Sequence, residues 1–508
     1  MNELHFPFLE CMIFIPLIGA AIVSTMKDPY RMRKWSVVFT GFAFCCAIGA
    51  WQDYGFLQAS EHHDDIIAGD RWHLMTLVFK SEIFSIDQIS APLLPLAALL
   101  YFLTTFATLR TKIRRFSFGW MLVSESLLLA TFSCKDPLGI VVLMMLGVLP
   151  TYFELLARGR SARVFALHIG LFLALLAFGW IRIEAEGSQE THSYLAVIPL
   201  LLAMMIRSGV APFHTWMIDL FDRATFGAAL LFVTPMVGAY GIVRLVLPAA
   251  PDHLLRAFGI LSLATAVYAA GMALVQRESR RFFCYIFLSH SSLVLVGLEM
   301  ATPIGLTGAL CVWLSVGVSL GGFGLTLRAL ESRRGRLSLI EFQGLYEHTP
   351  ELACCFVLTG LASVGFPGTV GFIGGELLVD GAVGIYPWIG PAVVVAAALN
   401  GMAMVKAYFL LFTGTRYSSS VSLSIGPREQ VAVLSLAALI LIGGLIPQYN
   451  VLSRFHAAKD VLIHRSERLK EEPANPDNMW GDEIEIADPP QPAATAEPTG
   501  ATTPAAEK

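Results

Sequence analysis

The chain has 508 residues, of which 55% are hydrophobic and 15% are charged, and its formal net charge is −4. This apolar fraction excludes an ordinary soluble fold and predicts a protein with many membrane-spanning helices. The nearly neutral charge excludes an extended basic surface, so we expect no nucleic-acid partner. The eight cysteines form no Cys-x-x-Cys pair and no Cys/His ligand spacing, so we expect no metal site in this chain.

Apolar segments long enough to cross a hydrocarbon layer of ~30 Å recur about fourteen times, which predicts an all-α polytopic membrane protein. A polar loop near 53–80 is expected outside the bilayer. The stretch 466–508 is rich in Pro, Ala, Glu and Thr and is expected to be disordered. The predicted spans are 8–26, 34–51, 89–109, 116–133, 137–157, 163–183, 194–217, 226–247, 254–275, 282–300, 303–329, 351–383, 386–414 and 428–447.

The basic residues predict how the chain crosses the membrane. The connections on one side hold about 21 Lys and Arg residues, and those on the other side hold about six. Basic loops stay on the cytoplasmic side. With an even number of spans, both termini are therefore expected on the non-cytoplasmic side.

Two predicted spans contain a helix break. The span 194–217 includes RSGVAPFHTW, broken at Pro212, and the span 351–383 includes ASVGFPGTVGFIGGE, broken at Pro367 and Gly368. Such a pair, at corresponding places in two halves, is typical of transporters built from inverted repeats. We therefore expect two inverted five-helix repeats. The predicted organisation is 1–115 as an N-terminal part, 116–250 and 251–415 as the repeats, and 416–465 as the last helix with an interfacial end.

Arg207 lies just before the first break, where a charged side chain costs several kcal/mol in a membrane helix. It is either one half of a structural ion pair beside a proline kink or the charged centre of a transport site. Glu125 and Glu154 are candidates for its counter-charge, and the depth of Glu125 favours that residue. Glu154 lies near Arg158 and is expected at the interface.

Five motifs in order resemble those of the antiporter-like membrane subunits of respiratory complex I, of the chain M or chain 4 type. They are SGVAPFHTW, GAYGIVRL, RRFFCYIFLSHSSLV, GFPGTVGFIGGE and KAYF. The resemblance runs from the N-terminus to about residue 450. It implies fourteen transmembrane helices with inverted repeats and breaks in helices 7 and 12.

The resemblance also implies a function. Such subunits translocate protons, coupled through the complex to electron transfer from NADH to quinone. The chain would then be one subunit of an enzyme, without a cofactor of its own. NADH, FMN, iron–sulfur clusters and quinone are expected in partner subunits. Other membrane-arm subunits and membrane lipid are the expected partners, and the inner membrane of a bacterium is the expected location.

Most ionisable positions of that family are substituted here. The seventh-helix lysine corresponds to Arg207, which keeps the charge but does not release a proton. We therefore expect a fixed positive charge that tunes or blocks a proton path. The other family positions are occupied by Met145, Met236, Ser315 and Gly375.

Several ionisable side chains remain as candidates for the path or its electrostatics. His214 follows the first break and either caps freed backbone groups or moves a proton. His290 matches a motif position, and His168 is expected to be a packed, hydrogen-bonded histidine. Glu376 stands one residue beyond the family's acidic position, and Lys406 is expected either to snorkel or to pair with it.

Three functions stay open at this point. The first is a complex I-like subunit that still assists proton translocation. The second is a degenerate, non-conducting scaffold of such a complex. The third is a subunit of a cation/proton antiporter, a membrane-bound hydrogenase or an inorganic-carbon uptake system.

Overall fold

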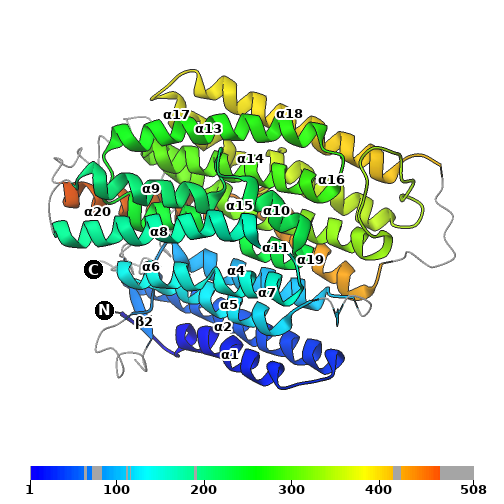
Figure 1. The fold of residues 1–508 in the computed structure, drawn as a ribbon. Helices are drawn as coiled ribbons and strands as arrows, with labels where there is room; N and C mark the ends of the chain where they lie inside the picture. Colours follow the sequence, from blue (N-terminus) through cyan, green and yellow to red (C-terminus); the bar gives the residue numbers. More distant parts are fainter. Residues whose placement is uncertain are drawn as a thin grey trace, which may run out of the picture. The chain divides into compact units, whose positions relative to one another are not determined.

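The computed structural model describes residues 2–61, 66–70, 83–109, 113–114, 116–187, 192–415 and 425–469. Residues Met1–Glu471 form one compact unit. Its long helices pack side by side with similar directions (Figure 1). The helices of the first part are α1 (Phe8–Ser24), α2 (Pro29–Glu61), α4 (Ser90–Phe106), α5 (Phe118–Ser133), α6 (Pro137–Leu146), α7 (Leu149–Ala157), α8 (Arg163–Glu186), α9 (Tyr194–Ser208), α10 (Thr215–Arg223), α11 (Phe226–Val233), α12 (Val237–Gly241) and the π-helix η2 (Ile242–Val246).

The second part of the unit is equally helical. Its helices are α13 (Asp252–Val275), α14 (Ser279–Met300), α15 (Pro303–Arg334), α16 (Pro350–Val364), α17 (Phe372–Val383), α18 (Ile389–Phe412), α19 (Pro427–Leu445) and α20 (Gln448–Leu469). Within the described ranges, nine helical segments are long and apolar enough to cross a membrane. The predicted all-α polytopic membrane fold is confirmed at this level.

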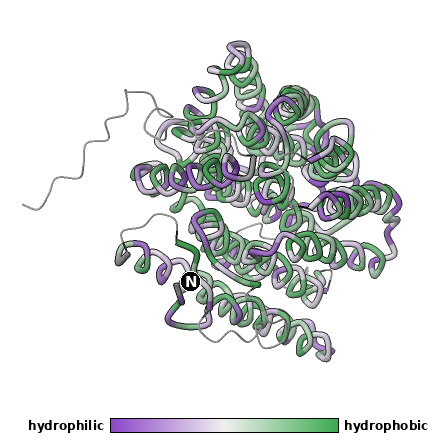
Figure 2. The backbone as a smooth tube through the Cα atoms, turned by 90° about the vertical axis from the view of Figure 1, so that its left-hand side faces the viewer, coloured by the Kyte–Doolittle hydropathy of each residue, from purple (hydrophilic) through white to green (hydrophobic). Residues whose placement is uncertain are grey.

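Hydrophobic residues occupy both the inside and the outside of this unit. Seen along the helices, residues coloured as hydrophobic occur in helices at the periphery as well as at the centre (Figure 2). Leu167, Ile181 and Leu445, for example, are 74%, 64% and 75% exposed. Large exposed apolar surfaces are rare in soluble monomers, and here they fit contact with lipid or with other subunits. At the centre, every residue of α14 from Phe282 to Met300 is buried.

A small sheet fixes the start of the chain. Strand β1 (Asn2–Leu4) pairs in parallel with β2 (Ala68–Asp70), which pairs antiparallel with β3 (Ser85–Ile86). The carboxylate of Asp70 accepts hydrogen bonds from the backbone N–H groups of Leu9 and Glu10, at 3.1 and 2.6 Å. These groups lack helical partners, so Asp70 caps α1 from a distant part of the sequence.

The predicted end of the second span was wrong. Helix α2 continues from residue 51 to Glu61, so part of the loop predicted near 53–80 is helical. No proline or glycine pair interrupts the sequence after residue 51. Asp53, on this extension, accepts a hydrogen bond from the backbone of His5 at 2.7 Å. Residues 62–65 and 71–82 lie outside the described part.

Four predicted spans are interrupted. The sequence predicted the interruptions between α9 and α10 and between α16 and α17. It did not predict those between α6 and α7 at residues 147–148 and between α11 and α12 at residues 234–236.

Helix α20 was also not predicted as a separate helix. It extends to Leu469, so residues 466–469 of the stretch expected to be disordered are helical, and residues 470–508 lie outside the described part. Two buried arginines attach α20 to the unit. Arg465 donates to the carbonyls of Leu247 and Ala250 at 3.0 and 3.1 Å. Arg454 donates to the carbonyl of Gln88 at 2.6 Å.

An ion pair forms at the end of the predicted span 226–247. Arg244, in η2, lies 2.6 Å from Asp87, just before α4. Burial alone would raise the pKa of Asp87, but the guanidinium of Arg244 and hydrogen bonds from Ser90 hold it below its usual value. The pair fixes the π-helical end of this span against the start of α4.

Candidate functional site

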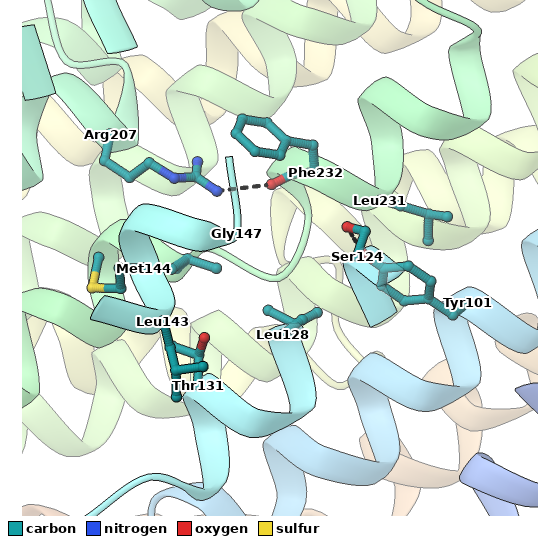
Figure 3. A pocket seen from close by; sticks show the side chains of 11 residues that line it. Tyr101, Ser124, Leu128, Thr131, Leu143, Met144, Gly147, Arg207, Leu231 and Phe232 are labelled. Atoms are coloured by element: carbon teal, nitrogen blue, oxygen red, sulfur yellow. Dashed lines mark hydrogen bonds between the residues drawn. The ribbon is translucent and has the colours of Figure 1, made fainter. Parts of the chain in front are cut away.

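Arg207 lies in the last turn of α9 and is 6% exposed. The helix ends at Gly209, which adopts the left-handed conformation at φ 75°. A residue with a Cβ is strained there. The Nη2 of Arg207 donates to the carbonyl of Phe232 at 3.3 Å (Figure 3). Its guanidinium carbon lies 4.1 Å from the centre of the Phe232 ring, a cation–π contact.

The predicted counter-charges of Arg207 are wrong. Among the described residues, no carboxylate lies within 4 Å of its guanidinium, so neither Glu125 nor Glu154 pairs with it. Arg207 is therefore not one half of a structural ion pair within the described residues. Glu125 is fully buried, and both of its carboxylate oxygens lack a hydrogen-bond partner. Its neighbour Ser124 lines a cavity beside Arg207, whereas Glu125 is not among the lining residues.

Ser124 faces a cavity of about 20 Å³ beside Arg207, which we call the inner cavity. This volume is enough for roughly one water molecule. Ser124 shares a hydrogen bond of 2.7 Å with the hydroxyl of Tyr101. The family's acidic position, Met145, does not line the cavity, whereas its neighbour Met144 does. The lining is Tyr101, Ser124, Leu128, Thr131, Leu143, Met144, Gly147, Arg207, Leu231, Phe232 and Val237 (Figure 3).

A second cavity of about 20 Å³, the middle cavity, adjoins the first. Both are lined by Tyr101, Ser124 and Leu231. The middle cavity is also lined by Glu154, which is 6% exposed, and its predicted place at the membrane interface stays a prediction. Its other lining residues are Trp120, Met121, Pro150, Thr151 and Ala228.

Glu154 connects to a wider space of about 110 Å³, the outer pocket. It accepts a hydrogen bond from Thr225 at 3.3 Å and lies 3.9 Å from Arg158. Thr225 and Arg158 both line the outer pocket. Its other lining residues are Phe116, Phe226, Gly227, Arg280, Arg328, Glu331 and Ser332.

The central family position, Met236, lies in the break between α11 and α12. It is 6% exposed and has φ 54°, a left-handed conformation that is rare for a bulky residue. The carbonyl of the preceding Pro235 accepts a hydrogen bond from the Trp313 indole at 3.3 Å. An uncharged side chain and a tryptophan thus occupy the region of the break where the family has a lysine.

Two histidines lie near the first break. His214 stands at the N-cap position of α10 but makes no capping hydrogen bond with its side chain, and its Nε2 lies 3.4 Å from the Tyr268 hydroxyl. His168 bonds to the carbonyl of Val164 at 2.9 Å and to Thr215 at 3.1 Å. His168 is thus packed and hydrogen-bonded, as expected. His214 is close to a tyrosine, and its predicted role in a path stays a prediction.

Two buried ionisable residues lie on the central helix α14. His290 is 3% exposed, and its Nε2 has no hydrogen-bond partner. Glu299, which the sequence analysis missed, is fully buried and accepts a hydrogen bond from Ser262 at 2.7 Å. Its signal in the sequence is an acid inside the apolar run LVLVGLEM. The helix opposite, α13, also contributes Thr265, which accepts from the backbone N–H of Ala211 in the first break at 3.2 Å.

The acidic residue after the second break, Glu376, is not buried as Arg207 is at the first break. Glu376, in the first half of α17, is exposed. The predicted pair with Lys406 is absent, because the Lys406 ammonium donates instead to the carbonyl of Leu274 at 2.9 Å. Ser315 is 2% exposed and faces this break, since a Cβ added to Gly371 would lie 2.5 Å from its hydroxyl. Within the described residues, no group of three or more His, Cys, Asp or Glu side chains is placed to hold a metal ion.

The fold and its apolar helices define a polytopic helical membrane protein. Residues 159–400 match the family model of the transmembrane part of NADH:quinone oxidoreductase and Mrp antiporters. The chain is 25% identical over 488 residues to NAD(P)H-quinone oxidoreductase chain 4 3 of Trichormus variabilis, covering 88% of this chain and 90% of that one. It is 27% identical over 385 residues to NADH-quinone oxidoreductase subunit 13 of Thermus thermophilus, covering 71% and 81%.

Solved structures agree on the fold. A chain of respiratory complex I from Thermus thermophilus matches with a TM-score of 0.77 and 22% identity, over 90% of this chain and 99% of that chain. A chain of the Mrp complex from Dietzia sp. matches with a TM-score of 0.77 and 17% identity, over 91% and 99%. The resemblance to antiporter-like membrane subunits of complex I, predicted from five motifs, is therefore confirmed.

Proposed function

We propose that this chain is an antiporter-like, proton-translocating subunit in the membrane arm of an NADH:quinone oxidoreductase-like complex. Its partners are other membrane-arm subunits and membrane lipid. The chain contributes no redox centre, and NADH, FMN, iron–sulfur clusters and quinone are bound in partner subunits. It lies in the bacterial inner membrane, with both termini on the non-cytoplasmic side.

We also propose that the chain has fourteen membrane spans and two inverted repeats. The nine apolar segments and the shorter apolar helices α1, α4, α5, α9 and α16 together form fourteen spans. Two inverted repeats of five spans each place their breaks at Arg207 and near Glu376. The count of apolar helices and the corresponding interruptions support this arrangement.

One observation carries the functional proposal. Arg207 is buried at a helix break, without a carboxylate partner among the described residues, and faces a cavity that fits a water molecule. A buried, unpaired cation is costly and finds its use in controlling charge nearby. Arg207 keeps a constant positive potential in the inner cavity, which opposes a proton there and so raises the barrier to its passage.

A reconstituted complex tests the proposal. The purified complex containing this chain is placed in liposomes with a pH-sensitive dye, and NADH and a quinone are added. We expect proton movement across the membrane, and a complex assembled without this chain should move at least a few-fold fewer protons per NADH. Equal proton yields with and without the chain would contradict the proposal.

The scaffold alternative rests on the substituted positions Met145 and Met236. If the chain only supports the complex, restoring Glu and Lys there creates a proton path. The double variant M145E/M236K should then raise the proton yield, whereas an unchanged yield on top of normal wild-type transport would exclude the scaffold. The structural match to an Mrp complex gives a third test, since sodium-dependent proton exchange without NADH would favour an antiporter.

A further inference from the structure

Three spaces follow one another through the first half of the described chain. The inner and middle cavities share the lining residues Tyr101, Ser124 and Leu231, so they adjoin at these side chains. The hydroxyls of Tyr101 and Ser124 are hydrogen-bonded at 2.7 Å and give this boundary a polar side. The boundary thus offers hydrogen-bonding groups to water on either side.

Glu154 forms the next boundary. It lines the middle cavity, and the two groups that contact its carboxylate, Thr225 and Arg158, line the outer pocket. The carboxylate therefore lies between a space for roughly one water molecule and a space of about 110 Å³ that holds several. Hydrogen-bonding groups accordingly continue from Arg207 to the outer pocket.

Among the described side chains that line these three spaces, one can readily take up and release a proton. Arginines keep their protons, which excludes Arg207 and the three arginines of the outer pocket as carriers. Glu331 is held by Arg280 through two hydrogen bonds to the same guanidinium. Tyr101 is a weak acid whose hydroxyl can only pass a proton along. Glu154 is the remaining carboxylate among the described lining residues.

We propose that Glu154 is the titrating carboxylate on a proton route between the outer pocket and the inner cavity. The inference rests on the proposed function and adds the group that carries the proton. A hydronium ion in the outer pocket breaks one O–H bond, and a new O–H bond forms on the Glu154 carboxylate. The carboxylic acid then gives that proton to water in the middle cavity and becomes a carboxylate again. No other reactant is needed.

The position of Glu154 explains how the route differs from the family pattern. The acid of that pattern falls on Met145 in α6, whereas Glu154 is in α7, beyond the break at residues 147–148. The break separates the two positions, so they do not share one continuous helix. Glu154 therefore serves the end of the route near the outer pocket, and the fixed charge of Arg207 faces the other end.

The experiment compares variants of the whole complex in liposomes with the same dye assay. Replacement Glu154→Gln should lower the proton yield per NADH at least fivefold, and Glu154→Asp should retain at least half of it, because a carboxylate is kept. Glu351→Gln, at an exposed carboxylate in the first turn of α16, is the matched control and should behave as wild type.

A second measurement does not depend on transport. Infrared difference spectra of the wild-type complex between high and low pH should contain a carboxyl C=O band that is lost in Glu154→Gln and kept in Glu351→Gln. Normal proton yield in Glu154→Gln, with this band unchanged, would overturn the inference and leave the proposed function intact. A wild-type complex that moves no protons through this chain would overturn both.

Discussion

The two helix breaks that look alike in the sequence differ in how the structure uses them. At the first break, Arg207 points inward and is 6% exposed, whereas the acid after the second break, Glu376, is exposed. The first break is held by side-chain hydrogen bonds, such as that from the Trp216 indole to the carbonyl of Ile206 at 2.9 Å. At the second break, backbones also approach closely at glycines, since a Cβ on Gly444 of α19 would lie 2.3 Å from the carbonyl oxygen of Gly368.

The two helix breaks are held in place in different ways. A Cβ on Gly308 of α15 would lie 2.3 Å from the backbone nitrogen of Leu378 in α17, so the second break is fixed by shape. Its charged side chain, Glu376, is exposed on the outside of the chain. The first break is fixed by polar contacts around an internal cavity. The same sequence pattern can therefore serve an internal path in one half and an external contact in the other.

The largest expected effect tests the fixation of the second break by shape. Gly308→Ala should reduce the free energy of unfolding by about 3 kcal/mol, since two backbones would have to move apart. Thermal unfolding in detergent measures this. Gly375→Ala, on α17 with nothing within 4 Å of the added Cβ, is the control and should be neutral or stabilising by up to ~1 kcal/mol. Equal stability of both variants would contradict the comparison.

The next effect concerns the inward charge of the first break. Arg207→Met removes the positive potential that opposes a proton in the inner cavity and should raise the rate of proton movement about tenfold, equivalent to ~1.4 kcal/mol off a barrier. Its unfolding free energy should not fall, because an unpaired buried charge is lost. Arg207→Lys keeps a cation and should stay closer to wild type. The dye assay and thermal unfolding check both statements, and a wild-type rate in Arg207→Met would refute the first.

A smaller effect is expected for the hydrogen bond that spans the first break. Trp216→Phe removes the indole donor to Ile206 and should reduce the free energy of unfolding by about 1 kcal/mol. Thermal unfolding again measures the change. No loss of stability would mean that packing, and not polar contact, holds this break.

The smallest effect on the isolated chain is expected at the outward charge. Glu376→Gln should change its unfolding free energy by less than about 0.5 kcal/mol, since the side chain is exposed. In the assembled complex the same variant should weaken attachment of a neighbouring subunit, measured by native mass spectrometry or gel shift. A large loss of stability in the isolated chain would show that the second break also depends on its charge.

The sequence predicted the features that follow from hydropathy and from strong breakers. It identified the membrane fold, and Pro212 and Pro367 marked two breaks. It did not predict the interruption at residues 147–148, where a single glycine stands in an apolar run. It also missed α20, because the average polarity of that helix hides its buried arginines.

The candidate site was less predictable, because it depends on which way side chains point. Arg207 was recognised as an expensive charge, but its partner was chosen from the depth of Glu125 alone, and Glu125 forms no ion pair with it among the described residues. Glu154 was placed at the interface by its closeness to Arg158, which does not predict that the neighbouring helices enclose it. Glu299 was overlooked, although an acid within an apolar run is a signal the sequence carries.

The arginines of α20 have a consequence for the order of synthesis. Arg465 holds the carbonyls of Leu247 and Ala250, more than two hundred residues earlier in the chain. While the ribosome is still making the second half, those carbonyls must be satisfied by water or lipid headgroups. The end of the first half therefore reaches its final contacts only after nearly the whole chain has been inserted. This timing would let the cell recognise an incomplete chain before the subunit joins a complex.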